Sequence, residues 1–265
     1  MIRLEWSDLA LAATLVLILA ALSWRSRLGI ERTLLVAAIR TALQLTLIGL
    51  VLDVLFSLSR LEWVAALAGV MVLLAGREVM ARQARPFAGW WGYGLGTLAM
   101  AASSCAVTVL ALTTMVSPTP WYEPRYSIPL LGMLLGNTMT GVALSLERLT
   151  ESTYRRRGEI EGRLMLGATA KQAIADIRQE SMRAGMTPII NGMVAAGIIS
   201  LPGMMTGQIL AGAPPVEAVK YQILIMFLIA AGTGFGTFVA VAMGSRRLFD
   251  DRERLRIDRL KPPRR

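Results

Sequence analysis

The sequence predicts an all-α fold, that of a polytopic membrane protein with about seven transmembrane helices, and three observations lead to it. Of the 265 residues, 54% are hydrophobic and the mean hydropathy is +0.53, which is too apolar for an ordinary soluble domain. The apolar residues gather in stretches long enough to cross the hydrocarbon core, which takes about 20 residues of helix. The basic residues gather between these stretches. Only helices and closed barrels satisfy their backbone polar groups in lipid, so we expect helices throughout.

Seven stretches are candidate spans. In chain order they are Trp6–Ser23, Leu34–Leu58, Trp63–Met80, Gly92–Val116, Ile128–Leu146, Thr187–Ile209 and Tyr221–Met243. The first has no strong basic region before it and no clear cleavage site, so we expect a retained helix rather than a removed signal peptide. The fifth is the weakest by hydropathy because Asn137, Thr138 and Thr140 interrupt it.

The distribution of charge predicts the topology. Of the 28 Lys and Arg residues, 23 fall in four segments between or after the spans. These segments are Trp24–Thr33, Arg77–Trp91, Glu147–Gly185 and Gly244–Arg265. Basic loops near spanning helices stay cytoplasmic, so the four segments should share that side. The N-terminus then lies outside, and residues 244–265 form a basic cytoplasmic tail.

Several classes of function are excluded or disfavoured. Cys105 is the only cysteine and histidine is absent, so an intramolecular disulfide is impossible and the usual nitrogen ligand of transition metals is missing. The net charge of +10 reflects basic residues that flank the spans, which favours contact with anionic lipid over nucleic-acid binding. The chain has no G-x-x-x-x-G-K-[ST] phosphate loop. Any ATP hydrolysis must therefore come from another chain.

The segment 147–185 is the longest polar stretch between spans, with eight basic and six acidic residues. Within it, Glu161, Gly167 and Ile177 have the spacing of the cytoplasmic coupling loop of ABC importer permeases, E-A-A-x3-G-x9-I-x-L-P. The match is partial, since Gly162 and Arg163 replace the two alanines, and Arg178, Gln179 and Glu180 stand in place of the terminal L-P. A solvated amphipathic helix between spans is the alternative. The predicted coupling residues are Glu161, Gly162, Leu166, Gly167, Ala168 and Thr169.

Polar side chains within the spans are few, which makes them candidates for lining a pathway. Asn137 is the deepest, and it either makes an interhelical hydrogen bond or faces a pathway. Methionine thioethers suit soft ions but more often fill gaps in packing. Gly132 with Gly136, and Gly203 with Gly207, have the four-residue spacing of closely packed helices, within one chain or across a dimer. The pathway candidates are Asn137, Thr138, Thr140, Asn191, Met193, Met204 and Met205; no metal-binding residues are assigned.

Five runs of sequence resemble the FetB (YbbM, UPF0014-type) family of ABC transporter permeases. They are Gly132–Gly141, Leu166–Thr169, Asn191–Met193, Ile199–Gly212 and Tyr221–Phe227. The resemblance implies a permease subunit, not an enzyme, in a two-plus-two assembly with a cytoplasmic ATPase. ATP and Mg would bind the ATPase, and this chain would bind no cofactor. The family includes a bacterial iron exporter and plant relatives tied to aluminium tolerance and UDP-glucose transport.

We therefore expect a single permease domain, residues 1–265, in the bacterial inner membrane, that exports iron and forms a homodimer. The alternatives are an ABC permease for another metal or a nucleotide-sugar-type substrate, an ATP-independent secondary carrier, and a membrane scaffold or sensor whose basic tail recruits a partner. The lack of an intramembrane cluster of carboxylates weighs against the carrier. The glycines and asparagines of the later spans weigh against the scaffold.

Overall fold

The computed structural model describes residues 5–58 and 60–262, and within them the chain is helical without a named strand. The predicted all-α class is confirmed. The chain divides into two compact units, Met1–Arg60 and Leu61–Arg265, and each is described by itself. That the chain acts as a single permease domain stays a prediction. Residues 263–265 of the predicted tail lie outside the described part.

The first unit is a hairpin of α1 (Trp6–Arg25) and α2 (Glu31–Leu58). The turn between the helices is closed by the Ser23 hydroxyl, which donates a hydrogen bond of 3.2 Å to the carboxylate of Glu31. Most of the apolar side chains of both helices are exposed. A helix that is apolar on all sides suits a lipid surrounding rather than water.

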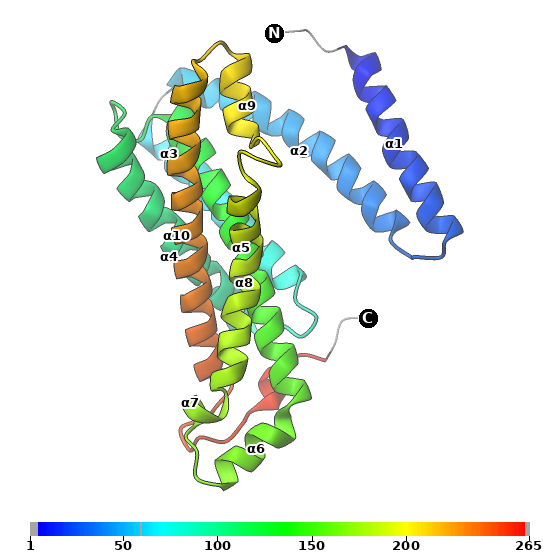
Figure 1. The fold of residues 1–265 in the computed structure, drawn as a ribbon, viewed down its shortest axis with the longest axis vertical. Coiled ribbons are helices and arrows are strands. Elements are labelled where there is room, and N and C mark those ends of the chain that lie inside the picture. Colours follow the sequence, from blue (N-terminus) through cyan, green and yellow to red (C-terminus); the bar gives the residue numbers. More distant parts are fainter. Residues whose placement is uncertain (1–4, 59, 263–265) are drawn as a thin grey trace. The chain divides into compact units, whose positions relative to one another are not determined.

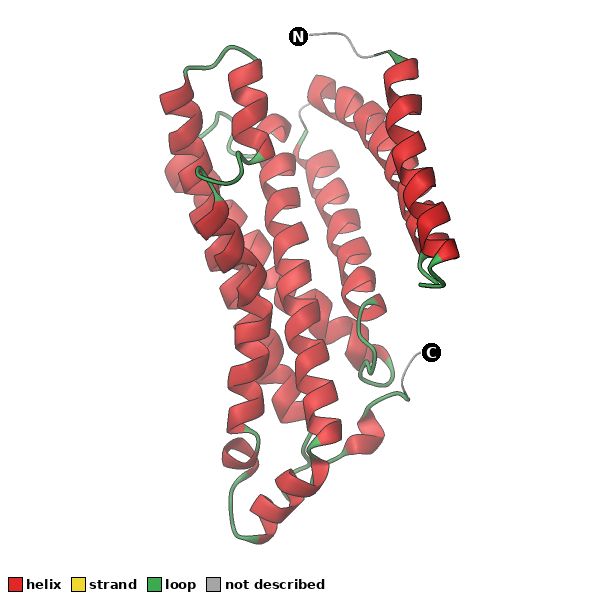
Figure 2. Ribbon diagram, turned by 45° about the vertical axis from the view of Figure 1, so that its right-hand side comes forward, coloured by secondary structure: helices red, strands yellow, loops and turns green. Residues whose placement is uncertain are grey.

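The second unit is a bundle of long helices that run alongside one another (Figures 1 and 2). α6 and α7 lie at one end of the bundle and α9 at the other. The helices are α3 (Leu61–Ala81), α4 (Trp90–Leu110, continued by a π-helical turn, Ala111–Val116), α5 (Pro124–Arg155), α6 (Arg157–Met165), α7 (Ala170–Ala173), α8 (Ala175–Ala195), α9 (Gly203–Leu210) and α10 (Pro215–Arg247).

Six helices of the described chain, α1 to α5 and α10, are long and apolar enough to cross a membrane. Each of these corresponds to one predicted span, so six of the seven spans are single helices. The fifth helix is longer than predicted: α5 continues from the predicted end at Leu146 to Arg155. The beginning of the segment 147–185 is therefore helix rather than loop.

The predicted sixth span, Thr187–Ile209, is not one helix. α8 ends at Ala195, and residues 196–202 form a turn before α9 begins at Gly203. Gly197 has φ +86°, a left-handed conformation that favours glycine, and its N–H donates to the Ser200 carbonyl at 2.9 Å. Hydropathy alone did not predict this break, because the turn residues are themselves mostly apolar.

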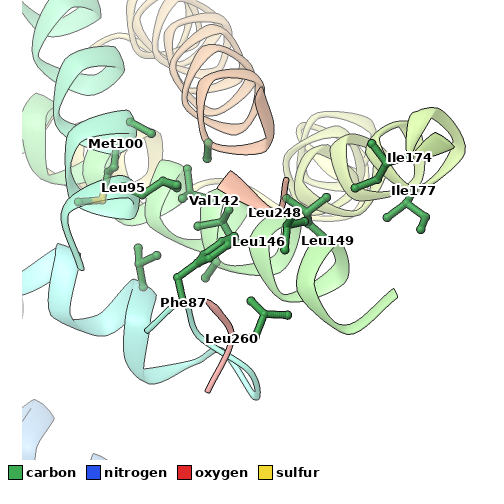
Figure 3. Packing of buried hydrophobic residues seen from close by; sticks show 14 of the residues in the cluster. Phe87, Leu95, Met100, Val142, Leu146, Leu149, Ile174, Ile177, Leu248 and Leu260 are labelled. Atoms are coloured by element: carbon green, nitrogen blue, oxygen red, sulfur yellow. The ribbon is translucent and has the colours of Figure 1, made fainter. Parts of the chain in front are cut away.

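The core of the second unit joins the long helices to the end that carries α6 and α7. Phe87, Leu146, Leu149 and Leu248 are almost fully buried and belong to one cluster (Figure 3). The same cluster includes Ile174. The α3–α4 loop, α5, α7–α8 and the chain after α10 thus share one apolar core.

Three helices, α5, α8 and α10, approach one another closely at one place. A Cβ atom on Gly141 would lie 2.6 Å from the Thr233 Cγ2 atom and 2.9 Å from the carbonyl oxygen of Gly185. By contrast, a Cβ atom on Gly136, Gly203 or Gly207 would meet no atom within 4 Å. Of the two glycine pairs at four-residue spacing, only Gly132 meets another helix, because a Cβ atom there would lie 3.3 Å from the Met71 Cε atom of α3. Neither pair therefore packs two helices together through both of its glycines, whereas Gly141 lies against two helices at once.

The predicted basic tail, 244–265, is folded onto the bundle over its described length, which the sequence analysis did not predict. α10 continues to Arg247, and Leu248–Lys261, here called the C-terminal segment, packs back onto the bundle. Lys261 donates its N–H to the Pro86 carbonyl at 2.9 Å, and Ala88 donates to the Arg259 carbonyl at 2.8 Å. Charge counting missed this because the apolar residues that anchor the segment are separated by arginines and aspartates.

Candidate functional site

The predicted coupling residues form a projecting tip at the end of the second unit. Met165 and Leu166 are 84% and 90% exposed, although both are large apolar side chains. Glu161, one turn earlier on α6, is also exposed. The tip thus presents two apolar side chains to the surroundings, with an acidic side chain near them.

The geometry of the tip explains Gly167. Gly167 has φ +89°, and its N–H donates to the Leu164 carbonyl at 3.0 Å. The N–H of Ala168 donates to the Arg163 carbonyl, also at 3.0 Å. This pair of bonds is the Schellman motif, which ends a helix at a left-handed residue. Gly167 therefore ends α6 and turns the chain so that Leu166 points outward.

Thr169 starts the next helix. Its hydroxyl accepts a hydrogen bond from the Gln172 N–H at 3.4 Å, and the Gln172 side chain accepts from the Thr169 N–H at 2.9 Å. This reciprocal capping box fixes the start of α7. Gly167 and Thr169 thus hold the two sides of the tip in fixed conformations.

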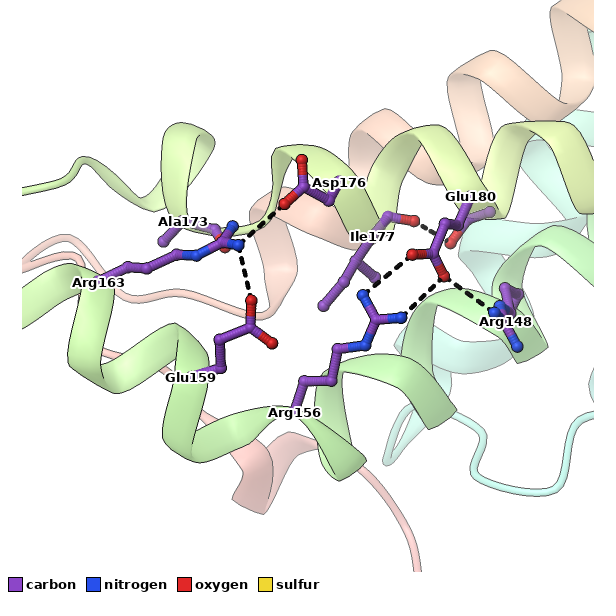
Figure 4. Close-up of polar contacts among 9 residues, drawn as sticks. Arg148, Arg156, Glu159, Arg163, Ala173, Asp176, Ile177 and Glu180 are labelled. Atoms are coloured by element: carbon purple, nitrogen blue, oxygen red, sulfur yellow. Dashed lines mark hydrogen bonds and ion pairs between the residues drawn. The ribbon is translucent and has the colours of Figure 1, made fainter.

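Arg163 connects α6 to the chain that follows the tip (Figure 4). Its guanidinium donates to Glu159 at 2.6 Å, to Asp176 at 2.9 Å and to the Ala173 carbonyl at 3.3 Å. One arginine therefore holds α6 against α7 and α8. The sequence pattern had counted Arg163 as a departure from the coupling motif.

Glu180 makes the second connection, between α8 and the end of α5 (Figure 4). Its carboxylate accepts hydrogen bonds from Arg148 at 2.9 Å and from Arg156 at 3.0 and 3.3 Å. The hydrogen bond from Arg148, followed by that from Arg156, lowers the pKa of Glu180 below its usual value of 4.5. The ion pairs keep the carboxylate charged at neutral pH.

These ion pairs were not among the predicted site residues. The only signal for them in the sequence is the mixed charge of the segment 147–185. The partners are up to 32 residues apart, so helix spacing at i, i+4 reveals only the Arg163–Glu159 pair. The remaining pairs depend on how α5, α6 and α8 fold back on one another.

Three of the predicted pathway residues lie toward an uncovered face of the α5–α8 pair. Asn137 and Asn191 are exposed, and Thr140 is half-buried. The Asn137 amide donates to the Met133 carbonyl at 2.8 Å, and Thr140 donates to the Gly136 carbonyl at 3.1 Å. Both bonds stay within α5, so neither side chain joins two helices.

Helix geometry places these residues on one side. On α5, Gly141 faces the place where α8 and α10 meet, and Thr138 faces α10. Successive residues of a helix are rotated by about 100° around its axis. Asn137 and Arg148 therefore lie on the side of Gly141 that is away from Thr138.

The same geometry applies to α8. Its Met186 lies beside Gly234 of α10, and Glu180 and Asn191 lie on the side of Gly185 that is away from Met186. The Arg148–Glu180 ion pair joins the two sides. This α5–α8 face is therefore turned away from the side that α10 covers.

The other pathway candidates lie inside the bundle. Thr138 is fully buried, and its Cγ2 atom occupies the space beside Gly236 of α10. Met205 is also buried, while Met193 and Met204 pack partly buried against the cluster of Leu134, Ile189 and neighbouring residues. A role of these four residues in a pathway stays a prediction. Within the described residues no group of three or more Cys, Asp or Glu residues is placed to hold a metal ion.

Comparison with known proteins gives one family. Residues 6–249 match the model described as "Uncharacterised protein family (UPF0014)". The match covers all the helices that are candidate spans and the coupling tip. No solved structure matches the chain.

Several curated proteins are similar over most of their length. A "UPF0014 membrane protein" of Synechocystis is 39% identical over 261 residues, which cover 96% of this chain and 98% of that protein. The "Probable iron export permease protein FetB" of Escherichia coli is 32% identical over 261 residues, 96% of each chain. The "UPF0014 membrane protein STAR2" of rice is 37% identical over 224 residues, 84% of this chain and 76% of that protein.

Proposed function

Since the chain belongs to the UPF0014 family of membrane proteins, we propose that it is the permease subunit of an ATP-binding cassette transporter. A separate ATPase subunit binds ATP and Mg and supplies the energy. The chain is a multi-pass membrane protein, and we place it in the bacterial inner membrane with its N-terminus outside. α8 and α9 together then make the sixth of seven crossings, which is interrupted at residues 196–202.

The observation that carries this proposal is the exposed tip at Met165 and Leu166. Two large apolar side chains in water are costly unless a partner covers them. The tip is also held rigidly, by the Gly167 turn on one side and by Arg163 on the other. A rigid apolar projection fits a cleft on a partner protein, which is how a permease without its own nucleotide site would engage an ATPase.

The ion pairs supply the route by which motion of the ATPase reaches the membrane helices. Arg163 fixes α6 to α8, and Glu180 fixes α8 to the end of α5. α5 and α8 then pack directly against each other at Gly141 and Gly185. A displacement of the tip therefore moves both helices as a unit rather than bending a loop.

The α5–α8 face is the place for the pathway and for a second copy of the chain. Amide and hydroxyl groups such as those of Asn137, Thr140 and Asn191 are unfavourable against lipid tails. A second copy that presents the same face would remove them from lipid and enclose a polar route between the two protomers. The break after α8 supports this arrangement, because non-helical backbone at membrane depth is tolerated beside protein or a water-filled cavity.

Iron is the substrate we propose, and export the direction. The support is the name of the Escherichia coli relative, a probable iron export permease. The side chains of Asn137, Thr140 and Asn191 on the α5–α8 face offer neutral oxygen and nitrogen atoms, which would pass a weakly held or chelated metal rather than bind it tightly. Another metal or a nucleotide-sugar-type substrate remains the alternative, and metal-stimulated ATP hydrolysis by the reconstituted pair distinguishes them.

Replacing Leu166 by aspartate tests the docking of the ATPase. The candidate ATPase, taken from the genomic neighbourhood of this chain, is co-expressed with the permease and captured through a tag on the permease. We expect Leu166→Asp to lose most of the captured ATPase and the transport that depends on it. Val216→Asp is the matched control, because Val216 is an exposed apolar residue at the start of α10. Equal capture by both variants would rule out the tip as the docking site.

A further inference from the structure

A cavity of about 490 Å³ lies next to the coupling tip, between α7–α8, α10 and the C-terminal segment. It has no part in the transport mechanism proposed above. Its walls combine an apolar part, formed by Phe238 and Ala242 of α10, with a charged part that includes Arg178 of α8 and Arg246 of α10. A cavity with these two parts fits an amphipathic ligand.

The charges in the cavity favour an anion. Lys171, Arg178 and Arg246 line it, and within the described chain none of the three makes a side-chain hydrogen bond or ion pair. The Nε atom of Arg178 is shielded from solvent and meets no hydrogen-bond acceptor. A buried donor without a partner is costly, so an acceptor on a ligand would stabilise it.

The acidic residues of the cavity do not offset these cations fully. The carboxylate of Asp250 already accepts from the guanidinium of Arg254 at 2.8 Å and from two backbone N–H groups. Glu253 accepts from the Ala170 N–H at 3.1 Å. Asp251, which is exposed, is the carboxylate left to face three basic side chains.

The long wall of the cavity runs along α10. Phe238, Ala242 and Arg246 are spaced four residues apart, so they form one stripe of the helix, about 12 Å long from the first to the last. The apolar end of this stripe adjoins the exposed ring of Phe235. The apolar part of the cavity therefore opens toward the lipid-facing side of α10, and its charged part lies toward the end of the helix.

Aromatic residues place the charged end at the level of lipid headgroups. The Arg247 guanidinium lies 4.9 Å from the centre of the Trp91 ring, and Trp90 beside it is 88% exposed. Tryptophan is enriched at membrane–water interfaces. The surrounding basic residues mark this interface as the cytoplasmic one, where anionic lipids are found.

We infer that this cavity binds an anionic phospholipid, whose phosphate contacts Arg178, Arg246 and Lys171 while an acyl chain follows Ala242 and Phe238. The inference rests on the chain being a membrane protein and does not depend on the proposed transport function. A lipid in this position would touch α8, α10 and the C-terminal segment at once. It would hold these three elements together beside the coupling tip.

Native mass spectrometry of the full chain in detergent tests the inference. After delipidation the protein is given phosphatidylglycerol or phosphatidylcholine, and retained lipid is counted per protein. We expect preferential retention of phosphatidylglycerol, reduced about tenfold or more by the double variant Arg178→Gln, Arg246→Gln. Arg183→Gln, an exposed arginine of α8 outside the cavity, should retain it fully. If the double variant does not fold, Lys171→Gln replaces it in the test, because Lys171 is an exposed side chain of the cavity, and it too should retain less phosphatidylglycerol.

A second variant separates a lipid from a free phosphate. Ala242→Phe fills the apolar part and keeps every charge, so it should lower retention of phosphatidylglycerol without affecting thermal stabilisation by glycerol 1-phosphate. If Ala242→Phe retains the lipid fully, or if phosphatidylcholine is retained as well as phosphatidylglycerol, the inference is wrong. Stabilisation by glycerol 1-phosphate without any retention of phosphatidylglycerol would also overturn it in favour of a soluble anion.

Discussion

The carboxylate of Glu253, in the C-terminal segment, accepts a hydrogen bond of 3.1 Å from the backbone N–H of Ala170, the first residue of α7. These residues are 83 positions apart in the chain. The bond ties the end of the protein to the helix that follows the coupling tip. The C-terminal segment is thus part of the structure that supports the tip.

Glu253→Ala should loosen α7 without unfolding the bundle. Loss of a capping acceptor costs about 1 kcal/mol, so we expect hydrogen exchange of the Ala170–Ala173 amides to become about fivefold faster. Hydrogen exchange read by mass spectrometry measures this directly. Asp251→Ala is the control, because Asp251 is an exposed acidic residue of the same segment. Unchanged exchange in Glu253→Ala would show that the segment does not support α7.

The stability of the end of the bundle should depend on pH through Glu180. Its pKa is lowered in the folded protein by the hydrogen bonds from Arg148 and Arg156. A group with a lowered folded pKa contributes stability above its unfolded value, and this stability is lost as the pH falls through the folded pKa. We therefore expect Glu180→Gln to lower the Tm at pH 7 and to have progressively less effect as the pH falls below about 4.5.

A scan of Tm against pH in detergent, for the wild type and Glu180→Gln, measures this difference. Glu161→Gln gives the comparison, since Glu161 is an exposed residue of α6 that makes no ion pair in the described structure. Its Tm should follow the wild type across the range. A Glu180→Gln difference that stays constant down to pH 3 would contradict the prediction.

Gly141→Ala should destabilise the second unit, because the added Cβ atom would lie 2.6 Å from Thr233 and 2.9 Å from the Gly185 carbonyl oxygen. A backbone oxygen cannot move aside as a side chain can. Overpacking of this kind costs about 1–3 kcal/mol, and a clear fall in Tm is expected. Gly69→Ala, in α3, is the control, since a Cβ atom there meets no atom within 4 Å. Equal Tm values for the two variants would mean that α5 and α8 separate readily.

Much of the fold follows from hydropathy, and the reasons for the exceptions are physical. A long apolar run predicts a helix because lipid leaves the backbone no other partner, and this held for six of seven spans. It did not hold at residues 196–202, where the turn is made by apolar residues and marked only by Gly197 and Pro202. The close approach at Gly141 was also hidden, because its partner Gly185 lies in the polar segment rather than in a predicted span.

The candidate site was predictable in part. The tip residues Glu161 to Thr169 could be singled out from spacing, and Gly167 does occupy a position that requires a left-handed conformation. The role of Arg163 could not be predicted from spacing, since it depends on Asp176, which comes near Arg163 only when the chain reverses at the tip. For the same reason the sequence does not reveal that the C-terminal segment packs on the bundle, since its partners, such as Pro86, are far away in sequence.

The α5–α8 face gives the last prediction, which tests the second copy of the chain. Cys105 is the only cysteine, so Cys105→Ser provides a cysteine-free background. In this background Asn137→Cys, on the exposed side of α5, should form a disulfide between two protomers when the membranes are oxidised. The protein would then run as a dimer on a non-reducing gel and return to a monomer with reductant.

Phe235→Cys is the matched control, because Phe235 is exposed on α10, on a side we expect to face lipid. Random collisions in the membrane would cross-link both variants equally, whereas a dimer that forms through the α5–α8 face would cross-link Asn137→Cys and not Phe235→Cys. Because a single position can miss the required geometry, Thr140→Cys and Leu144→Cys extend the test along the same stripe of α5. If all three α5 positions cross-link no better than Phe235→Cys, the polar groups of α5 must be covered by something other than a second copy.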